Sequence, residues 1–175
     1  DVGGAGGGNV LAARAIGALA ARHEVTLLAC RRPDLATLDR YAGTRLSGSG
    51  VRVTTGPAWL RAASRFAPVP LSLLRRAGLM RAARRIAHRY DAVLSLDNEV
   101  DVGRRAVQYV HFPWGFWPRP DVDLRWYHLG PLVKAYYALA YRVSEVDRDR
   151  IAANATLVNS DWTGRRFVET YGGSP

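Results

Sequence analysis

The chain has 175 residues, of which 48% are hydrophobic and 23% are charged, as in a single globular domain. This composition excludes a disordered tail, a collagen-like rod and a coiled coil, and the one cysteine, Cys30, excludes a disulfide framework and a thiolate metal cluster. The net charge of +10 arises mainly in residues 40–90, which hold eleven arginines and no acidic residue. A basic surface of this kind attracts anionic membranes or nucleic acid.

Neither a membrane-spanning helix nor a secretory signal is predicted. No stretch without charge approaches the length of about 18 apolar residues that a bilayer requires. The first residues lack a basic segment followed by an apolar run, so the predicted compartment is the cytoplasm.

A glycine-rich loop at residues 3–8 comes first, and an alanine-rich run at 9–22 predicts a helix with Asn9 as its N-cap. The segment 24–29 then predicts a short, fully buried strand that is apolar on both faces, as in a parallel sheet. A strand normally precedes the loop in such a unit, so we expect the chain to be clipped at its front.

The alternation of helices and strands continues to the last residues. In chain order, we expect a short helix at 34–42, a strand at 50–56, a helical stretch at 57–89 broken around Pro68 and Pro70, strands at 91–96 and 106–111, a Pro- and Trp-rich loop at 112–126, a helix at 128–150, a strand at 155–160, and a helix from Asp161 to Tyr171 with Ser160 as its cap and Gly172 as its stop. Strands separated by helices at this spacing predict one Rossmann-like α/β domain with a doubly wound parallel sheet over residues 1–175.

In open parallel sheets, ligands bind outside the carboxyl ends of the strands. This rule nominates the glycine loop, residues 97–99, His111 with the loop that follows it, and the pair Asn159 and Ser160.

The glycine loop is the candidate anion site. Gly6, Gly7, Gly8 and Asn9 at a helix start would let backbone amides approach a phosphate or a sugar, and a flexible turn is the structural alternative. No Gly-Lys-Ser/Thr follows, so the loop is not a P-loop, and the third glycine of a dinucleotide fingerprint would fall at Asn9. Arginines at 31–32 suit a 2′-phosphate, so an NADP-binding domain remains an alternative.

Three residues are candidates for catalysis. His111 ends a strand, where it can hydrogen-bond or move protons, although an ordinary loop histidine is the alternative. Asp97 and Glu99 would share a face of an extended segment and could act as a base or bind a hydroxyl. Asp101 is expected to be a solvated loop charge. No pair of ligands has metal spacing, so neither a metal nor another cofactor is expected.

Aromatic residues are dense around the predicted loop. They could stack on sugar rings or insert at a lipid interface, with core packing as the alternative, and they are Phe112, Trp114, Phe116, Trp117, Trp126 and Tyr127.

The basic stretch 59–90 alternates apolar residues with arginine pairs, as in an interfacial amphipathic helix. We expect docking to an anionic membrane through Arg75, Arg76, Arg84 and Arg85, and a solvated helix face is the alternative. Nucleic acid is not an expected partner, because no helix-turn-helix, RNA-binding or zinc signature is present.

Taken together, three segments resemble the N-terminal domain of a GT-B glycosyltransferase of family 4 (glycosyl transferase group 1). They are GGAGGGNVLAARAIGALAARHEVTLLA at 3–29, VQYVHFPW at 107–114 and LVNSDWTGRRFVETYGG at 157–173. The last is similar to the Asn-Ser-x-Trp-Thr stretch of mannosyltransferases that act on lipid-linked acceptors. The resemblance covers nearly the whole chain.

The resemblance implies transfer of a hexose such as mannose, with retention, from a nucleotide sugar to a lipid-linked or glycan acceptor. It places the glycine loop by the donor phosphates and His111 by the reacting sugar, and it nominates Asn98, Trp114, Asn159 and Ser160 for the acceptor. Such enzymes hold the nucleotide mainly in a second domain with an E-x7-E motif, which this chain lacks, so we expect the chain alone to be incomplete. Peripheral docking on the inner membrane face is also implied.

Overall fold

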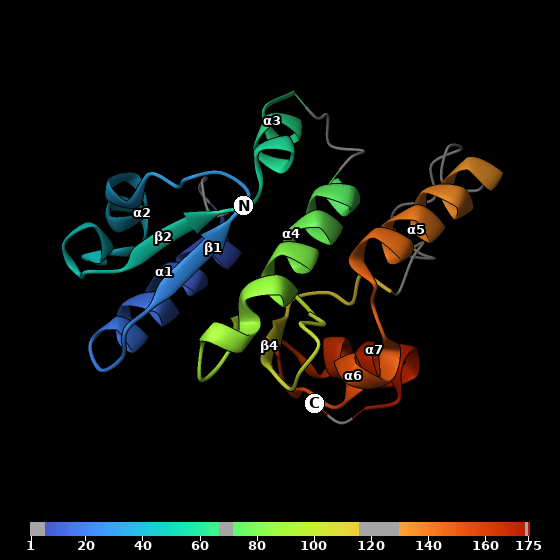
Figure 1. Ribbon diagram of the computed structural model, residues 1–175. Helices are drawn as coiled ribbons and strands as arrows, with labels where there is room; N and C mark the ends of the chain where they lie inside the picture. The colour runs from blue at the N-terminus through green and yellow to red at the C-terminus, as the bar shows by residue number, and fades with distance from the viewer. Residues whose placement is uncertain (1–5, 67–71, 116–129, 174) are drawn as a thin grey trace. The chain divides into compact units, whose positions relative to one another are not determined.

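The computed structural model describes residues 6–66, 72–115, 130–173 and 175. The chain divides into two compact units, Asp1–Val69 and Pro70–Pro175, each of which has its own parallel sheet. Both units combine helices with parallel strands (Figure 1), but no helix lies between the strands at 94–95 and 107–110 of the second unit. The predicted α/β class with parallel pairing is therefore confirmed.

The described residues of the first unit form two paired strands and three α-helices. Helix α1 (Gly7–Ala20) leads to β1 (Thr26–Ala29), which is followed by α2 (Leu35–Ala42), the single turn η1 (Leu46–Gly48), β2 (Arg52–Thr55) and α3 (Ala58–Phe66). The parallel strands pair from Thr26 opposite Arg52 to Ala29 opposite Thr55. Within β1 only Ala29 is buried, so the expected full burial of this strand is wrong. The physical reason is that β1 pairs with a single strand among the described residues.

Two aspartates fix the segment between β1 and β2. Asp34 caps α2, as its carboxylate accepts a hydrogen bond from the Thr37 amide at 3.1 Å. Asp39, near the end of α2, accepts hydrogen bonds from Thr44, Leu46 and Ser47. Desolvation by itself would raise the pKa of Asp39, but these donors outweigh it and lower that pKa well below its ordinary range.

The second unit is a three-stranded parallel sheet in the order β3-β4-β5. Its elements are α4 (Ser72–Ile86), the single turn η3 (Ala87–Arg89), β3 (Leu94–Ser95), β4 (Val107–Val110), α5 (Pro131–Ser144), α6 (Arg148–Ala152), β5 (Ala155–Val158) and α7 (Asp161–Tyr171). Helices α4 and α5 pack side by side (Figure 1). The register places Leu94 opposite Val107 and Val107 opposite Ala155.

The last helix begins and ends where the sequence predicts, with a side-chain cap from Ser160 and a left-handed stop at Gly172. The single helix expected at 128–150 is wrong. It is interrupted between α5 and α6, because Glu145 is left-handed with a φ of 56° and Asp147 caps a new helix. The expected break around residues 68–70 lies outside the described residues.

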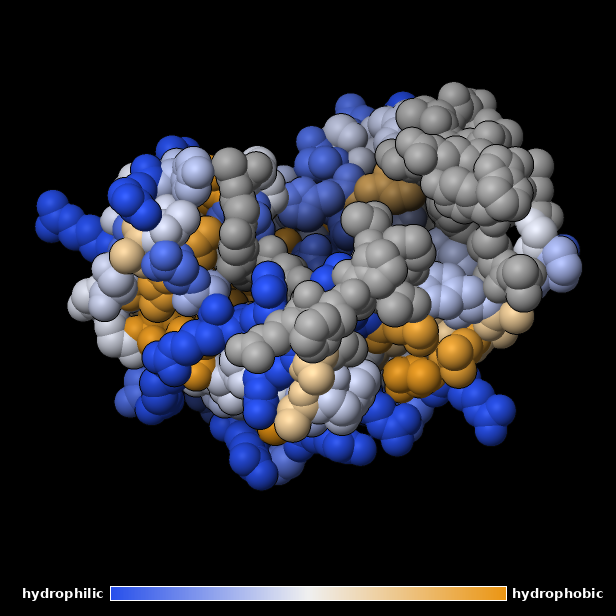
Figure 2. Space-filling view, turned by 90° about the horizontal axis from the view of Figure 1, so that it is seen from above, coloured by the Kyte–Doolittle hydropathy of each residue, from blue (hydrophilic) through white to orange (hydrophobic). Residues whose placement is uncertain are grey.

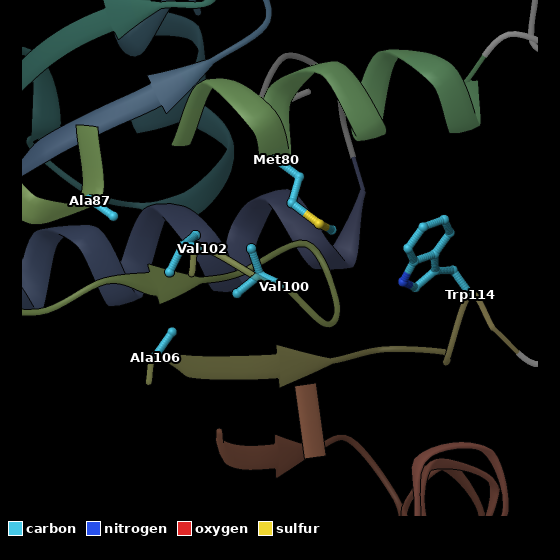
Figure 3. Close-up of a cluster of buried hydrophobic side chains, with 6 residues drawn as sticks. All are labelled: Met80, Ala87, Val100, Val102, Ala106 and Trp114. Carbon is cyan, nitrogen blue, oxygen red and sulfur yellow. The ribbon is translucent and has the colours of Figure 1, made fainter. Parts of the chain in front are cut away.

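Two hydrophobic clusters form the core of the second unit. One consists of Met80, Ala87, Val100, Val102, Ala106 and Trp114, between α4 and the sheet (Figure 3). The other consists of Val110, Ile151, Phe167 and Tyr171. Between them lies a polar core, in which the buried Gln108 side chain binds the Val100 amide, Asn154, Thr156 and the Ile151 carbonyl. Asn154 is thus a buried structural residue.

The surface mixes hydrophilic and hydrophobic residues, and the face seen in Figure 2 shows several separate hydrophobic areas among strongly hydrophilic side chains. The large hydrophobic residues that are exposed lie on five different elements. They are Tyr41, Trp59, Leu139, Leu157, Trp162 and Val168. Within the described part of the chain, no helix combines the length and the apolar character that a membrane crossing needs.

Candidate functional site

The carboxyl ends of β3, β4 and β5 bring together most of the residues nominated from the sequence. Residues 96–98 follow β3, His111 follows β4, and Asn159 follows β5. Because the three strands are parallel, these residues meet at one edge of the sheet. The Asn159 Nδ2 atom donates to the His111 carbonyl at 3.1 Å, which fixes two of the strand ends to each other. This edge is the candidate site of the second unit.

The His111 ring has a defined orientation. Its Nε2 atom lies 3.3 Å from the Leu96 carbonyl oxygen. The Tyr109 ring packs edge-on against the His111 ring, with the two ring centroids 4.9 Å apart. A carbonyl can only accept, so Nε2 carries the hydrogen and Nδ1 is the ring's acceptor in the neutral form. The ring is half-buried. His111 can therefore accept a proton or a hydrogen bond through Nδ1.

Asp97 and Glu99 do not share a face, contrary to the sequence-based expectation. Asn98 between them has a φ of 74°, so the segment is not extended. Asp97 is exposed, whereas Glu99 is 1% exposed. Asp97 is thus the carboxylate that a ligand at this edge could reach, and Glu99 is enclosed by the protein.

Glu99 is bound on several sides. Its Oε1 atom accepts hydrogen bonds from the Tyr171 hydroxyl at 2.6 Å and from the Trp114 and Gly115 amides at 2.7 and 3.3 Å. Arg76 Nη2 lies 3.7 Å from Oε2. Burial raises the pKa of the Glu99 carboxyl, against the opposing effects of Arg76 and of the hydrogen-bond donors. These contacts connect the Glu99 carboxylate to the segment after β4 and to the end of α7.

Asn98, Asn159 and Ser160 are also held by the fold. Asn98 Oδ1 accepts from the His111 and Phe112 amides at 2.6 and 2.9 Å. Asn159 Oδ1 accepts from the Thr163 hydroxyl at 2.6 Å, and Ser160 Oγ accepts from the Thr163 amide at 3.2 Å. Asn159 and Ser160 are exposed and can touch a ligand as well, whereas the Asn98 oxygen is occupied.

Trp114 belongs to the core. It is 7% exposed, stacks on Tyr141 with ring centroids 5.1 Å apart, and lies beneath the Arg76 guanidinium. The core-packing alternative is therefore the one the structure supports, and contact with an acceptor through an exposed Trp114 is not. Phe112 stacks on Trp162 at 5.7 Å. The other aromatic residues of the loop, Phe116, Trp117, Trp126 and Tyr127, lie outside the described residues.

The glycine loop starts α1 earlier than expected. The N-cap is Gly6, and the helix begins at Gly7, because the amides of Asn9 and Val10 both donate to the Gly6 carbonyl. The prediction that Asn9 caps this helix is wrong. Among described atoms nothing lies within 4 Å of a Cβ built on Gly6 or Gly7. Arg31 and Arg32, after β1, are exposed in the same unit.

Two of the four arginines nominated for membrane docking are bound within the protein. Arg76 donates to the Glu99 carbonyl at 2.9 Å, and Arg84 forms an ion pair with Asp101 at 2.6 Å. Arg75 is half-buried and Arg85 is exposed. Of this set, only Arg85 presents its charge as the amphipathic-helix interpretation requires.

Asp101 was expected to be solvated, and its side chain is fully buried instead. It pairs with Arg84 and with Arg150 at 3.1 Å and accepts hydrogen bonds from the Gly103 and Asp147 amides at 2.8 Å. Sequence spacing could not find these contacts, because Arg150 and Asp147 are 49 and 46 residues away. The alternation of Glu99, Val100, Asp101 and Val102 gives no signal for these contacts, because a polar–apolar period of two predicts a half-buried strand with outward carboxylates, whereas all four residues are buried.

In the described residues, no group of three His, Cys, Asp or Glu side chains is placed to hold a metal ion. Comparisons of the chain with protein-family models, with curated proteins and with solved structures return no match.

Proposed function

We propose that the chain is the N-terminal part of a GT-B glycosyltransferase that transfers a hexose from a nucleotide sugar to a lipid-linked or glycan acceptor, with retention, as its resemblance to family 4 implies. The observation that carries the proposal is the carboxyl edge of the second unit's sheet, where the His111 ring, the Asp97 carboxylate and the Asn159 amide follow three adjacent parallel strands. Polar groups that bind hydroxyls are thus gathered where parallel sheets bind ligands.

The first unit supports the donor side of this reaction. Glycosyl transfer leaves negative charge on the departing diphosphate, and amides at a helix start stabilise such charge without a metal. The start of α1 at Gly7 offers these amides. Proposed roles in the second unit are a hydrogen bond from a sugar or acceptor hydroxyl to His111 Nδ1 and orientation of an acceptor hydroxyl by Asp97.

Replacing His111 by alanine should lower sugar transfer by about 10²- to 10⁴-fold, the usual contribution of a general acid or base. The measurement is transfer of labelled sugar from a panel of nucleotide sugars to lipid-linked acceptors by the protein expressed from the complete open reading frame. His88→Ala, an exposed histidine after α4, is the matched control and should leave transfer unchanged. Normal turnover in His111→Ala would reject the role of His111, and no transfer with any donor would reject the function.

An NADP-binding domain is the second candidate, favoured by the exposed Arg31 and Arg32 at the end of β1. Titration with NADPH, followed by quenching of tryptophan fluorescence, separates the two candidates. A glycosyltransferase part should bind NADPH weakly or not at all, whereas saturable binding that Arg31→Gln abolishes would favour the oxidoreductase.

Docking to an anionic membrane is the proposed partner interaction. We expect Arg85→Gln to weaken binding to anionic vesicles by about fivefold, as for the loss of one basic residue near a lipid surface. Flotation with vesicles of phosphatidylserine and phosphatidylcholine measures this, and raised salt should weaken binding further. Arg22→Gln, which neutralises an exposed arginine outside the basic stretch 59–90, is the control and should change vesicle binding less than Arg85→Gln. Vesicle binding that changes neither with raised salt nor in Arg85→Gln would count against electrostatic docking.

A further inference from the structure

The five residues that follow β4, His111 to Gly115, have four backbone N–H groups, because Pro113 has none. All four are accepted by two oxygen atoms of two adjacent side chains. Asn98 Oδ1 accepts from residues 111 and 112, at 2.6 and 2.9 Å. Glu99 Oε1 accepts from residues 114 and 115, at 2.7 and 3.3 Å. We call these two oxygens the amide clamp.

The loop after β3 is shaped to present both oxygens. Asn98 has a left-handed backbone, its own amide donates to the Tyr109 carbonyl at 3.0 Å, and the Ser95 hydroxyl donates to its carbonyl at 2.6 Å. Asparagine is among the few residues that tolerate this conformation. The amide clamp is therefore built on a fixed loop, and Asp97, on the same loop, remains exposed.

Glu99 extends the clamp to the helices on either side. Tyr171, the last residue of α7, donates to the same Oε1 at 2.6 Å, and Arg76 of α4 donates to the Glu99 carbonyl at 2.9 Å. The segment passes so close to α7 that a Cβ on Gly115 would lie 2.6 Å from the Tyr171 hydroxyl. The position of the segment is thus set by α4, α7 and the loop after β3 together.

We propose that Asn98 and Glu99 are positioning residues that hold the His111 ring, and that the site they build takes a neutral, hydroxyl-bearing ligand rather than an anion. The clamp consumes every backbone donor of residues 111–115, so this segment has no amide left for a phosphate. Besides the exposed and neutral Asn159 and Ser160, the groups that remain are the acceptor His111 Nδ1 and the Asp97 carboxylate, and a sugar hydroxyl can donate to both. The identification of the hydroxyl with a sugar rests on the proposed function. The amide clamp itself rests only on the hydrogen bonds described above.

Amide hydrogen exchange on the 175-residue chain tests the clamp. Glu99→Met keeps an unbranched side chain but removes the acceptor, and we expect the Trp114 and Gly115 amides to exchange about tenfold faster, as for the loss of one hydrogen bond. Glu99→Gln retains an acceptor oxygen and should restore slow exchange. Amides of β2 in the first unit serve as the reference for general loss of structure. Unchanged exchange at residues 114 and 115 in Glu99→Met would overturn the clamp.

Asn98 offers a second matched pair. Asn98→Gly keeps the left-handed backbone and loses the oxygen, whereas Asn98→Asp keeps both. In Asn98→Gly the His111 ring should no longer hold one tautomer, and its ¹⁵N ring resonances should move toward the average of the two neutral forms. In Asn98→Asp the Nε2–H form should persist. A ring that stays in the Nε2–H form in both Asn98→Gly and Glu99→Met would reject the positioning role.

The ligand class is tested with two simple probes, methyl α-mannoside and inorganic phosphate, each titrated in the millimolar range. We expect the glycoside to shift the His111 ring resonances and phosphate to leave residues 111–115 unchanged. If phosphate shifts the amide resonances of residues 111–115, the assigned ligand class is rejected. It is also rejected if the glycoside leaves the His111 ring resonances unchanged. The exchange and tautomer results need no sugar donor, so failure of the clamp and failure of the proposed transfer reaction are distinguishable.

Discussion

Replacing Phe167 by alanine should lower the free energy of unfolding by about 4 kcal/mol, within the range for a buried phenylalanine. The side chain is fully buried in the cluster with Val110, Ile151 and Tyr171, and its ring centroid lies 5.1 Å from that of Tyr171. Truncation removes apolar burial and leaves a cavity between α7 and the sheet. Denaturant unfolding followed by tryptophan fluorescence measures the loss, since four of the five tryptophans belong to the second unit.

The next residue supplies the control. Val168 is on the same helix and is 42% exposed, so Val168→Ala should change stability by less than about 0.5 kcal/mol. Alanine has a higher helix propensity than phenylalanine or valine, so propensity cannot account for a loss, and equal losses in the two variants would contradict a special contribution of the buried ring. A loss under about 1 kcal/mol in Phe167→Ala would contradict the packing described for this cluster.

Asp101→Asn should be nearly as destabilising, by about 3 kcal/mol at neutral pH, because it removes the buried carboxylate that Arg84 and Arg150 share and leaves them only the partly exposed carboxylates of Glu145 and Asp147. The Arg84 side chain is 20% exposed and its guanidinium has Asp101 as its nearest carboxylate, at 2.6 Å. Asp91→Asn, an exposed aspartate of the same unit, is the matched control and should be close to neutral.

The pH dependence of this effect has a definite sign. Desolvation alone would raise the pKa of Asp101, but the Gly103 and Asp147 amides, Arg150 and Arg84 outweigh it, and the pKa is lowered from 3.8. A carboxyl with a lowered pKa stabilises the fold fully above its unfolded-state value and loses that contribution as the pH falls through the folded-state value. The difference between parent and Asp101→Asn should therefore be constant above about pH 5 and shrink in acid. A difference that grows in acid would contradict the ion pairs.

The elements that the sequence predicted best are those whose ends are set by neighbouring residues. Helix α7 is one example, since Ser160 and Gly172 cap it within a few positions of its own turns. The break between α5 and α6 is the opposite case. Glu145 adopts a left-handed backbone beside Arg81 and Arg84, which are more than 60 residues away. The local sign of this break is Asp147, which caps α6, while the left-handed turn at Glu145 is stabilised by distant side chains.

The same distinction holds for the candidate site. The strand-end rule located His111, Asp97 and Asn159 at one edge, because parallel topology alone places them there. It could not show that Glu99 and Arg76 are enclosed, since Tyr171 lies 72 residues from Glu99 and Arg76 lies 23 residues from it. Two neighbouring carboxylates, Asp97 and Glu99, thus differ in environment because of the backbone conformation of one residue, Asn98.

The important property of Pro113 is its missing backbone N–H group rather than the shape of its ring. It is fully buried in the middle of the segment held by the amide clamp, and it is the one residue there without an N–H group. Any other residue at this position would bring a further donor into an interior where Asn98 Oδ1 already receives two hydrogen bonds and Glu99 Oε1 three. Among homologues, position 113 should therefore remain proline even where another side chain would fit by volume.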